Sequence, residues 1–270
     1  MQAIHTLISS RFQIVGKRIC ESCGSEVNII KTVINGEERE VSQCLQCETK
    51  KLEQECNDYY KEREKRKAEM IFERFSFISD DLLNANFDNY IPDHPSKEEA
   101  KKKAQWYAKN FPSILNKEYD WQSLLFQGGY GLGKSHLAYS IAQYVKKLGY
   151  VVIFLDSPSL LRVIRESYGK ESDFTETEIL EMCYKADLLV LDDIGAEYVK
   201  SENGSESWAT DKLFQVIYAR MGKPTIYTTN YKSDELIAKY GQHGGRIVSR
   251  MMKGTKVIKF EGKDYRLKGF

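Results

Sequence analysis

Residues 128–135 read Gly-Gly-Tyr-Gly-Leu-Gly-Lys-Ser, a complete phosphate-binding loop of the G-x-x-x-x-G-K-[ST] type. Its glycines place no Cβ in the way, so backbone N–H groups can turn inward around phosphate oxygens. Lys134 brings a positive charge to the β- and γ-phosphates of a nucleotide, and the Ser135 hydroxyl is positioned to hold Mg²⁺. We therefore predict a nucleotide site that consists of Gly128, Gly129, Tyr130, Gly131, Leu132, Gly133, Lys134, Ser135 and His136.

The segments on either side of the loop support this prediction. Ser123–Gln127 is a short apolar run with the length of a buried strand, and an amphipathic helix is expected to begin at the loop. That helix directs the positive end of its dipole at the phosphates. The alternative is a glycine-rich turn without function. It is disfavoured because the strand, the loop, the Lys-Ser pair and the helix occur in register.

A second part of the site is expected at Leu188–Asp193, a buried strand that ends in two carboxylates. Ligands of parallel α/β sheets gather at the carboxyl ends of the strands, which is where Asp192 and Asp193 fall. Asp192 would complete the Mg²⁺ shell with Ser135, and Asp193 would orient or deprotonate the attacking water. Two acids at a strand end also occur as ordinary solvated residues, but next to a phosphate loop they favour nucleotide hydrolysis.

The composition excludes some classes of protein. The chain has 270 residues and a net charge of +1, so its overall charge does not indicate nucleic-acid binding. Residues 171–206 carry eleven acids against two bases, whereas residues 246–270 carry eight bases against two acids. These segments either attract each other between neighbouring copies or form two solvated surfaces. With no secretion signal and no apolar run long enough for a membrane span, we expect a cytoplasmic protein without disulfides.

Four of the six cysteines form two C-x-x-C pairs that are separated by twenty residues. Two such pairs point four thiolates at one centre and predict a closed, structural Zn²⁺ site made of Cys20, Cys23, Cys44 and Cys47. Redox pairs are less favoured, because redox motifs rarely occur doubled at zinc spacing. Cys56 and Cys183 are expected to be packing residues.

The residues between the two pairs support a zinc ribbon. Val27–Ile34 and Glu37–Val41 are predicted strands, and Asn35-Gly36 between them favours a type I′ hairpin turn. Residues 1–47 contain five basic and five acidic side chains, so the ribbon has no electrostatic footprint for DNA. We therefore expect the ribbon to dock another protein.

We predict three parts along the chain: a zinc-ribbon domain at 1–50, a helical linker at 51–75 and a nucleotide-binding domain at 76–270. The linker is dense in charges of both signs, which suits a solvent-exposed helix. In the last part strands alternate with helices, which indicates an α/β fold with a parallel sheet between two helical layers. The further strands expected are Val151–Asp156, Thr225–Thr229 and Lys256–Phe260, and the helices are Lys97–Phe111 (packed in part through Trp106), Ser159–Tyr168, Thr175–Lys185 and Thr210–Met221.

Several local motifs occur together in the order found in a known protein family. They are Gly-Lys-Ser-His-Leu-Ala at 133–138, Phe-Leu-Asp-Ser-Pro-Ser-Leu-Leu at 154–161, Leu-Leu-Val-Leu-Asp-Asp-Ile-Gly-Ala-Glu at 188–197, Thr-Thr-Asn at 228–230 and Arg-Ile-Val-Ser-Arg-Met at 246–251. With these motifs, residues 75–270 resemble the AAA+ ATPases of the DnaC/DnaI type, which load replicative helicases. The ribbon-before-ATPase layout is similar to that of DnaI-type loaders. The resemblance implies that the nucleotide is ATP.

The resemblance also implies roles for further side chains. Asn230 would be the sensor that helps to place the lytic water. Arg250 would be the arginine finger that reaches the γ-phosphate of a neighbouring subunit, and Arg246, one turn earlier, would support it. Arg266 resembles the family's second sensor, which acts within its own subunit. The alternative for each arginine is a solvated surface charge.

Two departures from the broader AAA+ pattern resemble the loaders. Asp193 stands where a Glu is usual, and only ten residues follow Phe260, so we expect no C-terminal helical lid. The related IstB transposition ATPases share much of the core, but that family implies no zinc ribbon.

The function that the resemblance implies is an ATP-dependent loader that binds a hexameric replicative helicase and helps to place it on single-stranded DNA. Head-to-tail self-association on ATP would accompany this activity, with ATP, Mg²⁺ and Zn²⁺ as cofactors. DNA is expected near Ser157, Ser159, Arg162 and Arg165, which equally suit an ordinary capped, solvated helix. Two alternatives stay open: a transposition ATPase that selects target DNA, and an adaptor whose nucleotide site only switches conformation.

Overall fold

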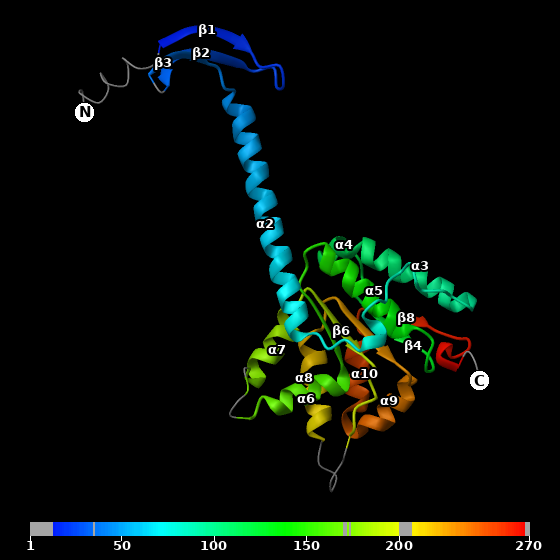
Figure 1. Cartoon of the computed structure of the whole chain (residues 1–270). Helices are drawn as coiled ribbons and strands as arrows, with labels where there is room; N and C mark the ends of the chain where they lie inside the picture. The colour runs from blue at the N-terminus through cyan, green and yellow to red at the C-terminus, as the bar shows by residue number, and fades with distance from the viewer. Residues whose placement is uncertain (1–12, 35, 170–171, 173, 200–206, 268–270) are drawn as a thin grey trace. The chain divides into compact units, whose positions relative to one another are not determined.

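The computed structural model describes residues 13–267, apart from residue 35, residues 170–171, residue 173 and residues 200–206 (Figure 1). The chain divides into two compact units, residues 1–63 and residues 64–270. The first unit contains an antiparallel sheet and the second a parallel sheet. Within the described part of the chain, no helix is long and apolar enough to cross a membrane.

The N-terminal unit has three antiparallel strands in the order β1-β2-β3: β1 (Gln13–Ile19), β2 (Glu26–Ile34) and β3 (Glu37–Val41). The pairing of Ile34 with Glu37 confirms the predicted hairpin. Asn35 lies outside the described residues, so the turn type stays a prediction. Most side chains of this sheet are exposed, and the buried apolar residues at its end are Cys20, Val27 and Cys44. So small a core is typical of units that a metal stabilises.

The second unit is built on a five-stranded parallel sheet with the order β5-β6-β7-β4-β8. In chain order, the strands are β4 (Ser123–Gln127), β5 (Val152–Asp156), β6 (Leu188–Asp192), β7 (Thr225–Thr229) and β8 (Thr255–Lys259). Because all neighbours are parallel, every carboxyl end lies at the same edge of the sheet. β4 lies between β7 and β8, and the chain leaves it for β5 at the far edge. The carboxyl end of β4 is therefore a point where ligands bind in such folds.

Helical layers cover both faces of this sheet. In β4, Leu124 and Phe126 join one hydrophobic cluster and Leu125 joins the other, as the alternation of strand side chains requires. Burial on both faces explains why the strands are nearly continuous apolar runs. The predicted α/β class with a parallel sheet is confirmed.

The helices divide between the two clusters. The first cluster contains residues of α3 (Pro95–Lys109), α4 (Phe111–Leu115) and α5 (Lys134–Lys147). The second contains residues of α6 (Ser157–Glu166), α7 (Glu176–Lys185), α8 (Trp208–Ala219), α9 (Ser233–Tyr240) and α10 (Gly244–Met252). The long helix α2 (Leu45–Phe75) precedes them, and its Phe72 is buried in the first cluster.

Capping residues explain where helix ends differ from the predicted ends. α6 begins at Ser157 and not at Ser159, because the Asp156 side chain accepts a hydrogen bond from the Ser159 N–H at 2.7 Å. A proline in the first turn suits the same start. Trp106 packs only in part: the residue is 40% exposed and its ring lies against those of Tyr119 and Trp121, whereas Tyr107 next to it is fully buried.

Candidate functional site

The phosphate-binding loop connects β4 to α5 at the carboxyl edge of the sheet. α5 begins at Lys134, so the N–H groups of its first turn open toward the loop and suit an anion. Gly131 and Gly133 have left-handed φ values of 61° and 83°. A Cβ at Gly131 would lie 1.6 Å from Asp264 Oδ1, and one at Gly133 would lie 2.6 Å from the Tyr90 ring. Only glycine fits these two positions.

Lys134 is 6% exposed, and oxygens of the site itself hold its ammonium group. Its Nζ donates to the Gly129 carbonyl at 2.6 Å and to Asn230 Oδ1 at 2.7 Å. The Asn230 amide donates in turn to Asp193 Oδ1 at 2.7 Å, which links the lysine to the acid. Burial lowers the pKa of Lys134 to about 8, although the neighbouring carboxylates offset part of this effect. A phosphate would offer the ammonium a charged acceptor in place of these neutral ones.

One hydroxyl holds both acids at the end of β6. Thr228 Oγ1 donates to Asp192 Oδ1 at 2.5 Å and accepts from the Asp193 N–H at 2.8 Å. Burial raises the pKa of Asp192 to about 6, while hydrogen bonds from Thr228 and Ser135 act against this rise. Burial also raises the pKa of Asp193, whose φ of 53° is uncommon for a residue with a Cβ. Such a backbone conformation persists only where its surroundings fix it, as the bond to Thr228 does here.

The ligands that Mg²⁺ needs come together beside the loop. Ser135 and Asp192 bring a hydroxyl and a carboxylate, the oxygen donors that Mg²⁺ prefers, and a hydrogen bond joins the two side chains. A buried carboxylate also gains from a cation, because the cation offsets the solvation that burial removes. These residues fit Mg²⁺, and phosphates and water would complete its shell.

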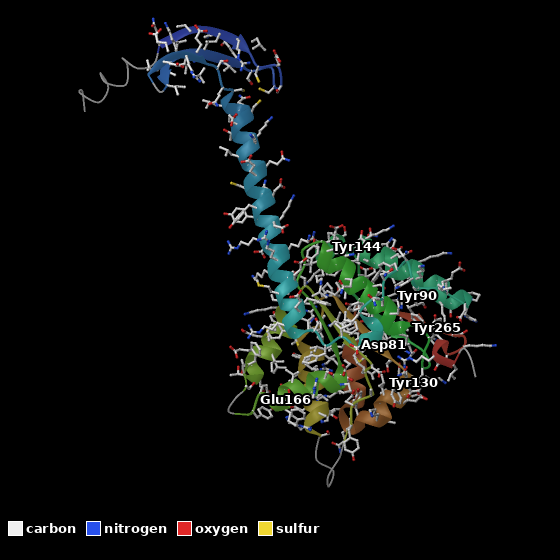
Figure 2. The ribbon with its side chains drawn as sticks, in the orientation of Figure 1. Asp81, Tyr90, Tyr130, Tyr144, Glu166 and Tyr265 are labelled. Atoms are coloured by element: carbon white, nitrogen blue, oxygen red, sulfur yellow. The ribbon has the colours of Figure 1, made fainter. Side chains whose placement is uncertain are left out.

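A cavity of about 660 Å³ opens beside the loop, a volume that suits a nucleotide. Part of its wall comes from residues 81–97, which no motif marks and which the sequence analysis missed. The Tyr90 hydroxyl donates to the Leu132 carbonyl at 3.3 Å, and His136 Nε2 donates to the Asn86 carbonyl at 2.8 Å. These bonds fasten that segment to the loop. Figure 2 shows four lining residues that gather on one side of this unit: Asp81, Tyr90, Tyr130 and Tyr265.

The C-terminal segment closes another part of the cavity wall. The Tyr265 N–H donates to the Gly131 carbonyl at 2.9 Å, next to the place that the Asp264 side chain occupies. Arg266 lines the cavity, and its guanidinium lies 3.4 Å from the Asp81 carboxylate. Both side chains of this pair are mostly exposed, so the pair contributes little stability and Arg266 is free to turn toward a ligand.

The arginines of α10 do not line this cavity. The Arg250 guanidinium lies over the rings of Phe214 and Tyr218, at 5.2 and 5.5 Å from their centroids. Its Nη1 donates to the Arg246 carbonyl at 3.3 Å, and its buried Nε has no hydrogen-bond partner among the described residues. The structure thus gathers around the phosphate loop the side chains of Asp192, Asp193, Asn230 and Arg266, and it places Arg250 apart from them.

Of the four residues expected to contact DNA, Ser157 is buried, Ser159 is half-buried and the two arginines are exposed. Ser157 is fully buried and donates its hydroxyl to Glu197 at 2.5 Å, so it does not reach DNA from this position, contrary to expectation. Arg162 and Arg165 are exposed on α6, and their guanidinium groups lie over aromatic rings. These two arginines are the basic groups that α6 presents to solvent.

The four paired cysteines of the N-terminal unit form one cluster, in which all Sγ atoms lie within 4.8 Å of one another. The Sγ–Sγ distances are 3.7 Å for Cys20 and Cys47 and 3.4 Å for Cys23 and Cys44. Thiolates arranged tetrahedrally at about 2.3 Å from Zn²⁺ would be about 3.8 Å apart, so the cluster fits this ion with little movement. Of the other two cysteines, Cys183 is buried in the second core cluster, as expected. Cys56 is exposed, so the prediction that it packs is wrong.

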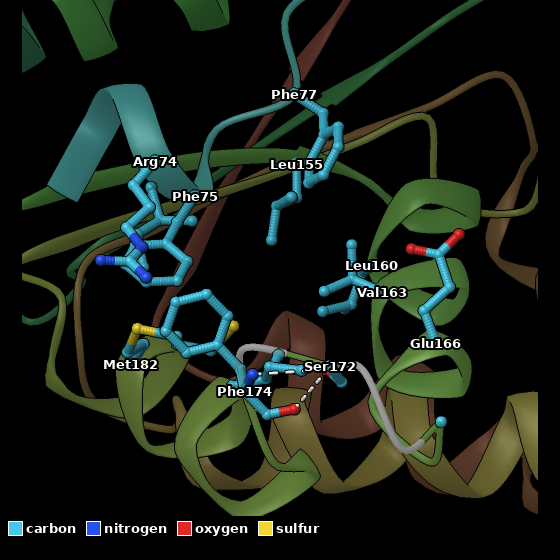
Figure 3. Close-up of a pocket in the computed structure, with 14 residues that line it drawn as sticks. Arg74, Phe75, Phe77, Leu155, Leu160, Val163, Glu166, Ser172, Phe174 and Met182 are labelled. Carbon is cyan, nitrogen blue, oxygen red and sulfur yellow. Dashed lines mark hydrogen bonds between the residues drawn. The ribbon is translucent and has the colours of Figure 1, made fainter.

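A second cavity of about 430 Å³ lies between the end of α2, β5, α6 and α7 (Figure 3). Its walls are mainly apolar, with Phe77, Leu155 and Leu160 among them. Arg74 at one wall lies over the Phe174 ring, 4.5 Å from its centroid. With no phosphate loop and no acid pair in its wall, this cavity is not the nucleotide site.

The sheet order, the loop after β4, the acids at the end of β6 and the amide after β7 define an ATP-binding P-loop protein of the AAA+ type. The sequence profile of the family described as "IstB-like ATP binding protein" matches residues 111–269, more than half of the chain. The chain belongs to this family.

Individual relatives agree with this assignment. The chain is 28% identical over 186 residues to the replicative helicase loader DnaC of Escherichia coli (strain K12), covering 68% of this chain and 69% of that protein. It is 26% identical over 249 residues to the replicative helicase loader DnaI of Bacillus subtilis (strain 168), covering 87% and 72%. The crystal structure of the DnaC helicase loader superposes with a TM-score of 0.56 at 25% identity, covering 68% of this chain and all of that one. The resemblance to loaders of the DnaC/DnaI type is confirmed.

Proposed function

We propose that this protein is an ATP-hydrolysing loader that binds a hexameric replicative helicase and places it on single-stranded DNA in the cytoplasm. The observation that carries the proposal is the similarity to the DnaI helicase loader, which covers 87% of the chain and therefore extends beyond the ATP-binding core. The side chains around the phosphate loop support hydrolysis in addition to binding.

We assign the steps of hydrolysis to side chains of the site. Lys134 and the loop hold the β- and γ-phosphates, and Ser135 with Asp192 holds Mg²⁺, which supplies positive charge against the phosphates. When Lys134 turns to a phosphate, it gives up Asn230 Oδ1, and this oxygen is then available to accept a hydrogen bond from the attacking water. The Asp193 carboxylate accepts the proton of that water, and its raised pKa suits a proton acceptor near neutral pH.

We assign to Arg250 a role in the site of a neighbouring copy. It lies outside its own cavity, in a segment with a net charge of +6, whereas the acids lie in a segment with a net charge of −9. A contact between these unlike surfaces is head-to-tail and propagates as a ring or an open helix. The γ-phosphate gives Arg250 a charged acceptor, so the assembly should require ATP and weaken after hydrolysis.

We assign zinc to the four-cysteine cluster and helicase docking to the domain that contains it. The proposed parts are a zinc-ribbon domain at 1–50, a helical linker at 51–75 and an ATPase domain at 76–270. The boundary between the two compact units, after Arg63, falls inside α2, which supports a linker of continuous helix. Arg162 and Arg165 are the proposed groups for the phosphates of single-stranded DNA.

The test is a loading assay with purified proteins. Full-length protein, a bacterial hexameric replicative helicase and circular single-stranded DNA with an annealed forked strand are mixed, and release of the strand is followed. We expect release to depend on this protein and ATP, and to be lost with Lys134→Ala. The Cys44→Ser variant should keep ATP binding and lose helicase binding. Strand release that is independent of this protein for every helicase tried would refute the proposal.

The family match favours one other function, that of an IstB-like ATPase in transposition. Such a protein would act on duplex target DNA with a transposase and would need no helicase. Equal affinity for single- and double-stranded DNA, unchanged by ATP, together with no effect on helicases would favour that function.

A further inference from the structure

Glu197 is a buried carboxylate, 3% exposed, that the proposed hydrolysis does not use. Its oxygens accept hydrogen bonds from three neutral donors: the Ser157 hydroxyl at 2.5 Å, the Gly195 N–H at 3.1 Å and the Tyr240 hydroxyl. These donors come from the start of α6, the turn after β6 and the end of α9. Burying a carboxylate among neutral groups is unfavourable, so fold stability alone does not explain its place here.

The bonds that Glu197 accepts from Ser157 and Gly195 fix the turn that carries Asp193. In this turn Asp193 and Gly195 have left-handed φ values of 53° and 99°, and a Cβ at Gly195 would lie 2.5 Å from the Tyr231 ring. Glu197 holds the turn closed through the Gly195 N–H. The Ser157 hydroxyl, which donates to Glu197, also lies 3.0 Å from the Asp193 carbonyl oxygen. The carboxylate thereby sets the backbone from which the Asp193 side chain extends.

The third bond, from Tyr240, joins Glu197 to α9, the helix that precedes the Arg250-bearing helix α10. Tyr240 is the last residue of α9, and only η2 (Gly241–His243) separates it from α10. Gly244, the first residue of α10, packs against α9 so closely that a Cβ there would lie 2.2 Å from the Ile237 carbonyl oxygen. α9 and α10 therefore form one piece, and the bond between Tyr240 and Glu197 sets its position relative to the β6 turn.

We propose that Glu197 is a positioning residue that aligns both halves of a composite ATPase centre. Its bonds to Ser157 and Gly195 place Asp193 for the ATP of its own subunit, and its bond to Tyr240 places Arg250 for the ATP of the neighbour. This inference rests on the proposed function, because it requires Arg250 to act in a neighbouring site. A purely structural Glu197 predicts instead that each change here lowers all activities together.

The bonds of Glu197 form two arms: the α6 arm, through Ser157 and Gly195, leads to Asp193, and the α10 arm, through Tyr240, leads to Arg250. Variants that change single atoms separate these arms. Tyr240→Phe removes the bond between Glu197 and α9 and keeps the Ser157 bond, whereas Ser157→Ala removes the bond to α6, together with the contact to the Asp193 carbonyl, and keeps the Tyr240 bond. Glu197→Gln keeps one oxygen for Ser157 and Gly195 and offers its amide to the Tyr240 hydroxyl, which can rotate to accept, so it should retain most activity. Glu197→Ala leaves the Gly195 N–H and the Tyr240 hydroxyl without this acceptor and should lose both functions.

Subunit mixing measures each arm by itself. Lys134→Ala chains contribute only an intact Arg250, and Arg250→Ala chains contribute only an intact ATP site, so the mixture should regain hydrolysis. Tyr240→Phe in the Lys134→Ala chain should lower the regained kcat by about tenfold or more, because small displacements of a catalytic group are expensive in rate. The same change in the Arg250→Ala chain should alter kcat less than about twofold. Ser157→Ala should show the opposite pattern, with an ATP affinity within about threefold of the parent.

Equal losses from Tyr240→Phe in either chain would overturn the proposal, as would a loss with Glu197→Gln as large as that with Glu197→Ala. If the parent mixture regains no hydrolysis where the wild type assembles, the trans role of Arg250 is refuted and the α10 arm falls with it. The α6 arm is then decided on single chains. An unchanged kcat for Ser157→Ala in the otherwise wild-type protein would refute this arm as well.

Discussion

The buried carboxylate of Asp192 should make the ligand-free protein less stable, and Asp192→Asn should remove this effect. The asparagine keeps the shape of the side chain and its oxygen still accepts from Thr228, so the core is unchanged while the charge is removed. The carboxylate ionises with a pKa of about 6 in the folded protein against an ordinary 3.8, chiefly because it is buried. Folding therefore disfavours the ionised form.

The size of the effect follows from linkage. The difference between 3.8 and about 6 corresponds to about 3 kcal/mol of folding free energy once the group is ionised in both states. Below the unfolded-state pKa of 3.8, the Asp192 carboxyl is protonated in both states, and its ionisation costs no stability. As the pH rises toward the folded-state pKa of about 6, the unfolded state ionises first, so the wild type loses stability until the carboxyl is ionised in both states. Relative to wild type, Asp192→Asn should therefore be more stable by about 1.5 kcal/mol at pH 5 and about 3 kcal/mol at pH 8.

Urea unfolding of both proteins between pH 4.5 and pH 8, without nucleotide, measures this difference. Asp58→Asn is the matched control, because Asp58 is exposed on α2 and its replacement should leave the pH profile unchanged. Adding Mg²⁺ and ATP at pH 8 should stabilise the wild type and not Asp192→Asn, since a ligand of the folded state raises stability only where it binds. Unfolding free energies of wild type and variant that run parallel at every pH would refute the reasoning.

Three further outcomes test the site. Asp193→Asn should bind ATP within about threefold of wild type and lose hydrolysis by about a hundredfold, because asparagine tolerates the left-handed backbone but accepts no proton; hydrolysis at the wild-type rate would exclude this acid as the base. Metal analysis should find one zinc ion per chain, lost with Cys44→Ser and kept with Cys56→Ser, the exposed control. Gly131→Ala should weaken ATP binding, because the added Cβ would collide with Asp264. Gly222 has a similar φ but open space around it, so Gly222→Ala should only lower the unfolding free energy by about 1 kcal/mol. Equal ATP affinities of the two variants would show that the collision with Asp264 is unimportant.

Much of the fold was predictable because its strands have a local signature. Ser123–Gln127 and Thr225–Thr229 occur where predicted, since strands buried on both faces form short apolar runs between turn residues. The phosphate loop and the cysteine pairs were equally visible, because their chemistry requires fixed spacing along the chain. Helix ends such as that of α6 were less predictable, because a side chain cap decided them.

The supports of the site were not predictable, because they pair residues that are far apart in sequence. Thr228 reads as an ordinary strand residue, yet its hydroxyl holds both acids 35 and 36 positions earlier. In the sequence, Glu197 is simply an acid two positions after a glycine, and only the structure brings Tyr240 to it. The Tyr90 segment carries no motif, and only the folded chain shows that it walls the nucleotide cavity.

The two hydrogen bonds that Lys134 donates to Gly129 and Asn230 have a consequence for anion binding at the loop. An anion that binds the Lys134 ammonium competes with both hydrogen bonds, and a nucleotide, unlike inorganic phosphate or sulfate, can also fill the cavity beside the loop. We therefore expect free phosphate to bind this site more weakly than a nucleotide does. If the protein hydrolyses ATP as proposed, Asn230 lies where it can take back the Lys134 ammonium when the γ-phosphate departs, which would oppose rebinding of that phosphate.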